Sequence, residues 1–321
     1  MNVLSILVRR VALGLVTAWA ILTVFFLSFT VTRDWVASSI SGATVGALTG
    51  PNSDFTADQA HEAAEQRIAE YAADRGLDRP LYEQYLDWMG NMLTLDWGES
   101  LETGEPAFGM VVDATLRTAM YVVPATVLAV CLGLGIGLYA ALQPGSRLAD
   151  TGRLGSYLMF GVPSFWLGGL FVGAVWSETI GHSALLFDHI LPIALVTMTL
   201  LGGYVSYSRA YALEEASEEF VTLVRAKGAG PVRIARHIVR NAAIPMFSML
   251  FTEALGLLML AIFVIEVVFG IEGFGLLFFF AMVGRDIPVI LGAAIVIIAV
   301  GVVGNILQDI SYQYLDPRVG G

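Results

Sequence analysis

Cysteine and lysine are almost absent from this chain, and each absence excludes a class of site. Cys131 is the only cysteine, so an intrachain disulfide, a zinc site and an iron–sulfur cluster are all excluded. Lys227 is the only lysine, and it stands between Ala226 and Gly228. The phosphate-binding sequence G-x-x-x-x-G-K-[ST] is therefore missing, and the chain has no nucleotide-binding loop of that kind.

Signatures of catalysis are missing as well. The four histidines, His61, His182, His189 and His237, form no HExxH or other ligand spacing, and no G-x-S-x-G nucleophile motif occurs. We therefore predict no catalytic residues, no metal site and no enzymatic activity in this chain.

Charge is also scarce, since charged residues make up 14% of the chain and hydrophobic residues 56%. A helix needs about 20 residues to cross a hydrocarbon core. Continuously apolar runs of that length predict helices, because the strands of a membrane barrel alternate and are about half as long. We predict an all-α integral membrane protein with six transmembrane helices. The runs are 11–32, 118–146, 154–177, 189–208, 241–265 and 287–308. Five of them are uncharged, and Glu253 alone interrupts the run 241–265.

The basic residues predict the orientation of these helices, since short cytoplasmic loops carry an excess of lysine and arginine. With a cytoplasmic N-terminus, the two short outer loops, 178–188 and 266–286, hold only Arg285. The inner segments hold Arg9, Arg10, Arg147, Arg153, Arg209, Arg225, Lys227, Arg233, Arg236, Arg240 and Arg318. We therefore expect a multi-pass protein of a prokaryotic plasma membrane with both termini in the cytoplasm.

Most of the acidity lies in one long outer segment. We divide the chain into a first segment, 1–32, an acidic extracytoplasmic domain, 33–117, and a five-helix membrane core, 118–321, that includes the segment 209–241. The acidic domain has 15 acidic and five basic residues. Scattered acids with almost no lysine favour a halophilic source, because carboxylates stay hydrated in concentrated salt. The alternative is an acidic patch that attracts a cationic substrate.

The acidic domain has its own helical pattern. We predict helices at 57–74 and 80–92 and a loop at 38–54, which is rich in glycine, serine and threonine. Leu77, Leu81, Tyr85, Trp88 and Met89 form an apolar face, which we expect to pack against the membrane domain.

The segment 209–241, between the fourth and fifth runs, is charged and has helical periodicity on both sides of a break at Gly228, Gly230 and Pro231. This pattern predicts a helix, a sharp turn and a second helix. A surface hairpin of this kind suits docking into a groove of another protein. An ordinary connecting loop is the alternative.

The hairpin carries a residue pattern that we can compare with known families. The residues are Glu219, Phe220, Arg225, Ala226, Lys227, Gly228, Arg233, His237 and Asn241. The pattern resembles the cytoplasmic motif of the dipeptide, oligopeptide and nickel permeases of ATP-binding-cassette (ABC) importers. In that family the hairpin sits in a cleft of the ATPase subunit, so the resemblance implies that these residues couple the permease to ATP hydrolysis. We expect Gly228 to adopt a positive φ or to allow a close backbone approach.

The resemblance covers nearly the whole chain. Further matching stretches are 77–80 with 84–85, 97–100, 163–168, 266–269 with 273–275, and 315–318. They imply a type I ABC importer permease fold of the first-permease, dipeptide-permease B type, with an extracytoplasmic insertion between helices 1 and 2. The chain departs from the pattern at Thr222, where many other importer permeases have an acid, and at Arg240, where many relatives have proline. These departures leave the contacts of both residues open.

The resemblance also implies the partners. They are a homologous second permease, two ATP-binding subunits at the hairpin that hold ATP-Mg, an extracytoplasmic substrate-binding protein and the lipid bilayer. We expect no cofactor in this chain and no nucleic-acid partner. The substrate stays open among dipeptides, oligopeptides, nickel chelates and oligosaccharides.

Three residues are candidates for the translocation path. Glu253 is the one ionisable residue deep within a run, and such residues are costly in lipid. It could face the path, pair with the partner permease or lie near a span end. Ser164 and Trp166 follow Pro163, which could kink the third helix. The alternative function is an ion-driven secondary transporter, which would be expected to show several intramembrane carboxylates and inverted repeats.

Overall fold

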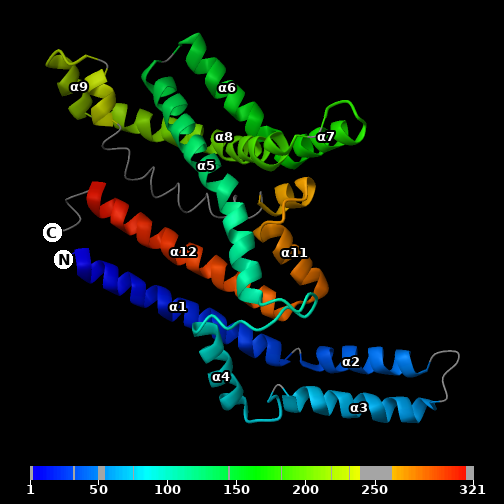
Figure 1. Cartoon of the computed structure of the whole chain (residues 1–321). Helices are drawn as coiled ribbons and strands as arrows, with labels where there is room; N and C mark the ends of the chain where they lie inside the picture. The colour runs from blue at the N-terminus through cyan, green and yellow to red at the C-terminus, as the bar shows by residue number, and fades with distance from the viewer. Residues whose placement is uncertain are drawn as a thin grey trace. The chain divides into compact units, whose positions relative to one another are not determined.

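The computed structural model describes residues 3–31, 33–49, 55–74, 76–143, 145–181, 183–217, 219–230, 232–238 and 262–315. These residues are almost entirely helical, and the one β-bridge among them joins Glu99 to Pro106. The chain divides into two compact units, one formed by Leu15–Gly98 and the other by Met1–Gly14 with Glu99–Gly321. The all-α prediction is therefore confirmed (Figure 1).

The unit Leu15–Gly98 contains most of α1 and three further helices. The bounds are α1 Val3–Val31, α2 Arg33–Leu48, α3 Ala57–Asp74 and α4 Leu81–Leu93. A capping box starts α3, because the Thr56 amide donates to Gln59 Oε1 at 3.0 Å and the Gln59 amide donates back to Thr56 Oγ1 at 3.4 Å. The predicted helices at 57–74 and 80–92 are thus confirmed.

The predicted loop at 38–54 is wrong over its first part, because α2 continues to Leu48. The helix packs against α3, where Thr44 is buried on α2 and Ala60 and Ala64 are buried on α3. Small side chains let two helices approach closely, and this packing outweighs the weak helix propensity of glycine, serine and threonine.

The aromatic members of the predicted apolar face of α4 pack on α1. The Phe26 ring lies 5.3 Å from the Tyr85 ring and 5.4 Å from the Trp88 ring, measured between centroids. The Tyr85 hydroxyl is 2.8 Å from Thr23 Oγ1. Leu81, by contrast, is exposed.

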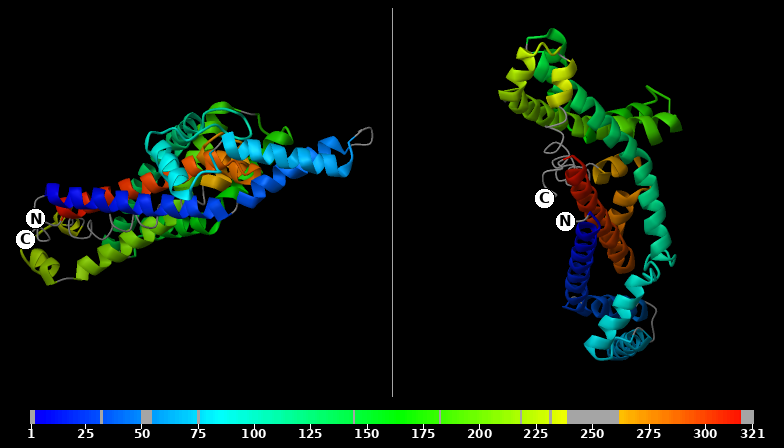
Figure 2. Two further views of the ribbon diagram at one scale, coloured as in Figure 1. Left: turned by 90° about the horizontal axis from the view of Figure 1, so that it is seen from below. Right: turned by 90° about the vertical axis from the view of Figure 1, so that its left-hand side faces the viewer.

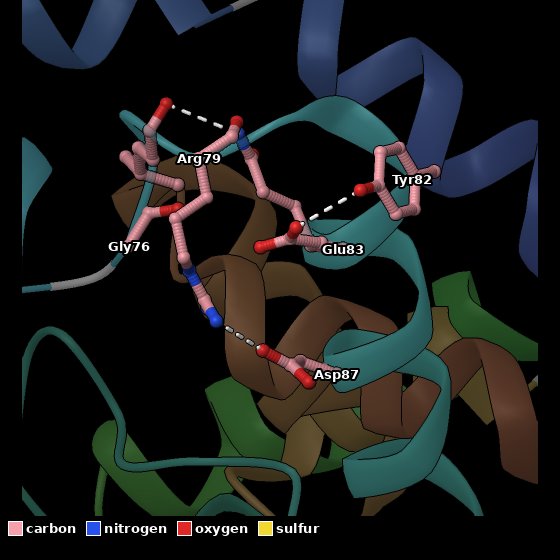
Figure 3. A network of polar contacts seen from close by, with 7 residues as sticks. Gly76, Arg79, Tyr82, Glu83 and Asp87 are labelled. Atoms are coloured by element: carbon pink, nitrogen blue, oxygen red, sulfur yellow. Dashed lines mark hydrogen bonds and ion pairs between the residues drawn. The ribbon is translucent and has the colours of Figure 1, made fainter.

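A polar network stabilises the turn that leads into α4 (Figure 3). Arg79 forms an ion pair with Asp87 at 2.7 Å and donates to the Gly76 carbonyl at 3.4 Å. The Tyr82 hydroxyl donates to Glu83 Oε1 at 3.0 Å. Arg79 and Asp87 are both substantially exposed, so this network lies on the surface of the unit and not in its interior.

The second unit is built around α5, which packs along α8. Its helices are α5 Ala107–Leu142, α6 Arg147–Gly161, α7 Ser164–Trp176, the π-helical turn η1 Leu185–Ile190, α8 Leu191–Ser217, α9 Glu219–Ala226, a helix at 232–238, a helix Ile262–Phe269, α11 Phe274–Gly284 and α12 Ile287–Leu315. The core between α5 and α8 includes Tyr121, Ala125, Val196 and Leu200.

Two glycines allow the close approach of α5 and α8. A Cβ at Gly137 would collide with Ser208 Oγ, and one at Gly133 would collide with Tyr204. The Ser208 hydroxyl donates to the Gly133 carbonyl at 2.9 Å. Small residues of this kind allow membrane helices to pack closely.

Four helices of the described residues are long and apolar enough to cross a membrane. They are Val8–Ser28, Ala107–Leu142, Leu185–Ser217 and Ile287–Gln308. Two bent pairs, Arg147–Gly161 with Ser164–Trp176 and Ile262–Phe269 with Phe274–Gly284, turn by 76° and 86°. Six spans result if each pair counts as one. Most of the predicted fifth run, 241–265, lies outside the described residues.

Proline has two different roles in these helices. Pro163 precedes α7 at the first bend, which agrees with the predicted kink of the third run. Pro124 lies at the middle of α5, because this helix begins at Ala107 and ends at Leu142. The α5 ribbon is bent along its length (Figure 1), as expected of a helix in which proline removes a hydrogen bond.

Candidate coupling site

The hairpin has the helix–turn–helix structure that the sequence predicts. After α8 ends at Ser217, α9 spans Glu219–Ala226, and a second short helix covers 232–238. Both lie beside the C-terminal end of α5 (Figure 2). The structure does not describe Asn241 or the side chains of Glu219, Phe220 and Arg225.

The turn between the two helices depends on Gly228. Its φ is +75°, in the left-handed region that residues with a Cβ rarely adopt. The Ala229 amide donates to the Val224 carbonyl at 3.3 Å, and the Lys227 amide donates to the Leu223 carbonyl at 3.1 Å. The bond across Gly228 is that of a Schellman motif, which ends α9. The predicted positive φ is confirmed.

The inner face of the hairpin is buried against α5 and α8. We call this group the hairpin cluster, and its buried members are Ala141, Ala212, Val221, Ile234 and Ile238. Leu138, Leu142, Ala216, Val224 and Ala229 pack around it. Val221 and Ile238 are at most 1% exposed, so these apolar contacts fix the position of the hairpin on the two long helices.

The outer face of the hairpin is exposed and basic. Val232 is 82% exposed and Leu223 58% exposed, so each helix presents an uncovered apolar side chain. The exposed positions around them are Ala226, Lys227, Gly228, Arg233, Arg236 and His237. Apolar side chains among bases make this face suitable for another protein.

The candidates for the translocation path lie elsewhere. Ser164 is the first residue of α7 and is half-buried, while Trp166 is 53% exposed. Both therefore follow the bend between α6 and α7. Glu253 lies outside the described residues.

A second polar site was missed at the sequence level. Its centre is Glu266, whose side chain is fully buried. Thr118 Oγ1 and the Tyr121 hydroxyl donate to its Oε1 at 2.5 and 2.7 Å, and the Leu276 amide donates to its Oε2 at 2.9 Å. The glycines that follow Glu266 in the sequence are the signal that could have revealed this site, because a Cβ at Gly273 would collide with the Glu266 carboxylate.

Comparisons with known proteins agree with this architecture. Residues 133–321 match the family model described as binding-protein-dependent transport system inner membrane component. The chain is 30% identical over 290 residues to the di/tripeptide transport system permease protein DppB of Pseudomonas aeruginosa, covering 79% of this chain and 85% of that protein.

Two further relatives are similar over comparable lengths. The oligopeptide transport system permease protein AppB of Bacillus subtilis is 29% identical, with 79% of this chain and 84% of that protein covered. The metal-staphylopine import system permease protein CntB of Staphylococcus aureus is 27% identical, with 78% and 82% covered. The chain belongs to the family of binding-protein-dependent transport system inner membrane components and is a multi-pass plasma-membrane permease subunit of an ABC importer.

Proposed function

We propose that this permease imports peptides, and that partner ATPases drive it through the hairpin 209–241. The names of two relatives refer to oligopeptides and to di- and tripeptides, and that of a third to a metal chelate. Permeases of the family work with a second permease, ATPases and a binding protein. The finer assignment here is two ATPase subunits, which hold ATP-Mg, and a homologous permease as the other half of the path.

One observation carries the coupling role, and it is the division of the hairpin into two faces. Its inner face is buried in the hairpin cluster, so a force applied to the hairpin reaches α5 and α8. Its outer face exposes Val232 and Leu223 among Lys227, Arg233 and His237. A hairpin that is packed on its inner face and exposed on its outer face can bind a partner and transmit the partner's movement.

Charge supports a cytoplasmic position for this face. Eleven bases lie in the segments on the hairpin side and one in the short loops of the opposite side, which favours cytoplasmic termini and a cytoplasmic hairpin. ATP and the ATPase subunits are on the same side. The exposed acids of α3, among them Glu62, Glu65 and Glu70, would then lie outside the cell. Because carboxylates stay hydrated in concentrated salt, this position supports a saline habitat for the organism.

The test is a glycine pair in the hairpin. Gly228→Val places a β-branched residue at φ +75°, whereas Gly230→Val is the matched control, because Gly230 also has open space for a Cβ but lacks a positive φ. The complex of both permeases, the ATPases and the binding protein is reconstituted in liposomes. We expect Gly228→Val to insert normally and to lose ATP hydrolysis stimulated by substrate-loaded binding protein, while Gly230→Val keeps it.

Two outcomes would contradict the proposal. Unchanged stimulation in Gly228→Val would show that the turn does not couple the subunits. Uptake that needs no ATPase, and that stops when an ionophore removes the proton or sodium gradient, would favour the ion-driven alternative. A competition series of peptides, metal chelates and oligosaccharides against the binding protein identifies the substrate class.

A further inference from the structure

Glu266 is a buried carboxylate that the coupling role does not explain. It accepts hydrogen bonds from Thr118 and Tyr121 of α5 and from the Leu276 amide of α11. We call this group of contacts the Glu266 network. No basic side chain of the described residues forms an ion pair with the carboxylate. A buried carboxylate is strongly unfavourable unless donors surround it, so these donors determine where the carboxylate lies.

The network lies at the sharper of the two bent helix pairs. The helix Ile262–Phe269 meets α11 at 86°, and the turn 270–273 connects them. Thr118 takes part twice, because its Oγ1 donates to Glu266 and accepts from the Phe274 amide at 2.7 Å. The carboxylate therefore joins three segments: the helix before the bend, the start of α11, and α5.

The same helix, α5, reaches the hairpin at its C-terminal end. Leu138, Ala141 and Leu142 belong to or pack against the hairpin cluster, while Thr118 and Tyr121 belong to the Glu266 network. The 17 residues from Tyr121 to Leu138 correspond to about 25 Å of helix. A single helix thus contacts both the proposed ATPase-docking hairpin and the bend.

We propose that Glu266 is a positioning residue for transport, which holds the turn 270–273 on α5 so that movement of α5 carries this turn with it. The inference rests on the proposed function, since the movement starts at the hairpin. The hydrogen bonds between Glu266 and α5 lie on the N-terminal side of Pro124, which lacks the amide of a helical hydrogen bond. The bent pair and the N-terminal half of α5 then move as one body.

Both side-chain oxygens of Glu266 accept hydrogen bonds, so each of the two positions must hold an acceptor. In Glu266→Gln the Oε1 atom can still accept from Thr118 and Tyr121, but the Nε2 group faces the Leu276 amide, so two donors oppose each other. The variant has nearly the same size and keeps the packing. It therefore tests the hydrogen bonds of the carboxylate with little change in the space that the side chain fills.

The matched control is Glu272→Gln. Glu272 lies in the turn 270–273 and pairs with Arg117 of α5 at 2.5 Å, but its side chain is 80% exposed. In the reconstituted complex, we measure substrate taken up per ATP hydrolysed. We expect Glu266→Gln to lower this ratio about tenfold, the effect of losing one buried hydrogen bond, and Glu272→Gln to change it by less than about threefold.

The measurements separate coupling from folding and from the proposed function. Glu266→Gln should still co-purify with the ATPases and hydrolyse ATP, because the hairpin is intact, whereas a hairpin variant loses stimulation itself. An unchanged uptake ratio in Glu266→Gln would overturn the positioning role. If the wild-type complex shows no uptake that depends on ATP and binding protein, the proposed function fails instead.

A cross-link tests the same idea without touching the network. Arg117→Cys and Glu272→Cys, in a Cys131→Ser background, are bridged with a bifunctional thiol reagent. If the two segments move together, bridging changes the uptake ratio by less than about threefold relative to a monofunctional label. Inhibition by the bridge alone would mean that the segments must separate during transport, and the proposal would be wrong.

Discussion

The two halves of α5 are attached to the core by different kinds of contact. At its C-terminal end the hairpin cluster is apolar, with Val221 and Ile238 almost fully buried. In its N-terminal half, Thr118 and Tyr121 bind a buried carboxylate. Apolar contacts are non-directional and weaken gradually as volume is lost, whereas a buried polar network needs every donor and acceptor in place.

This difference matches the role that the proposed function gives to each half. In that proposal another protein presses on the exposed face of the hairpin, and non-directional packing allows small shifts at little cost. The bend near Glu266 must keep one geometry, because Gly273 and Gly275 bring the backbone close to the carboxylate. The following variants test this contrast, in order of decreasing expected effect.

The largest loss of local stability is expected at the hairpin cluster. Ile238→Ala removes a side chain that is fully buried, and truncation of a buried isoleucine costs about 2–5 kcal/mol. Hydrogen exchange of the α9 amides, measured by mass spectrometry, should accelerate accordingly. Val232→Ala on the same helix is the control, because Val232 is 82% exposed. Equal exchange in both variants would contradict the buried inner face.

Thr118→Val is expected to have the next largest effect. Valine has nearly the same shape but can neither donate to Glu266 nor accept from the Phe274 amide, and each buried group left unpaired costs about 1–3 kcal/mol. The thermal unfolding midpoint of the purified permease should fall. The control is Thr126→Val on the same helix, whose hydroxyl donates to the Val122 carbonyl one turn back and has no other bond among the described residues. A midpoint no lower in Thr118→Val than in Thr126→Val would show that the network does not stabilise the bend.

Hydropathy predicted the helices well because it measures the free energy of transfer into lipid, and that depends on composition. The runs 11–32, 118–146, 189–208 and 287–308 all fall on helices able to cross a membrane. Hydropathy contains no information on direction, so the bend after Gly161 is invisible except through Pro163. Residues 107–117 carry Asp113 and Arg117, and the sequence therefore gave no sign that α5 begins before the apolar run.

The hairpin could be predicted more fully than the network. Periodicity and two glycines predicted the helices and the turn, including the positive φ of Gly228, because these depend on neighbouring residues. The Glu266 network depends on Thr118, about 150 positions earlier, and no local pattern connects the two. The loop expected at 38–54 failed for the same reason, because contact with α3 stabilises α2.

The smallest effect is expected where a polar network is exposed. Asp87→Asn breaks the ion pair with Arg79. The Asp87 and Arg79 side chains are 57% and 44% exposed, and exposed pairs of this kind contribute between about 0 and 1 kcal/mol. The unfolding midpoint should therefore change little, and any difference should vanish in 1 M salt, where screening acts over about 3 Å. A fall in the unfolding midpoint as large as that of Thr118→Val, still present in 1 M salt, would mean that solvent exposure does not determine how strongly these contacts stabilise the protein. The contrast between Glu266 and Arg79 would then need another cause, such as the rigidity of the turn at Gly76.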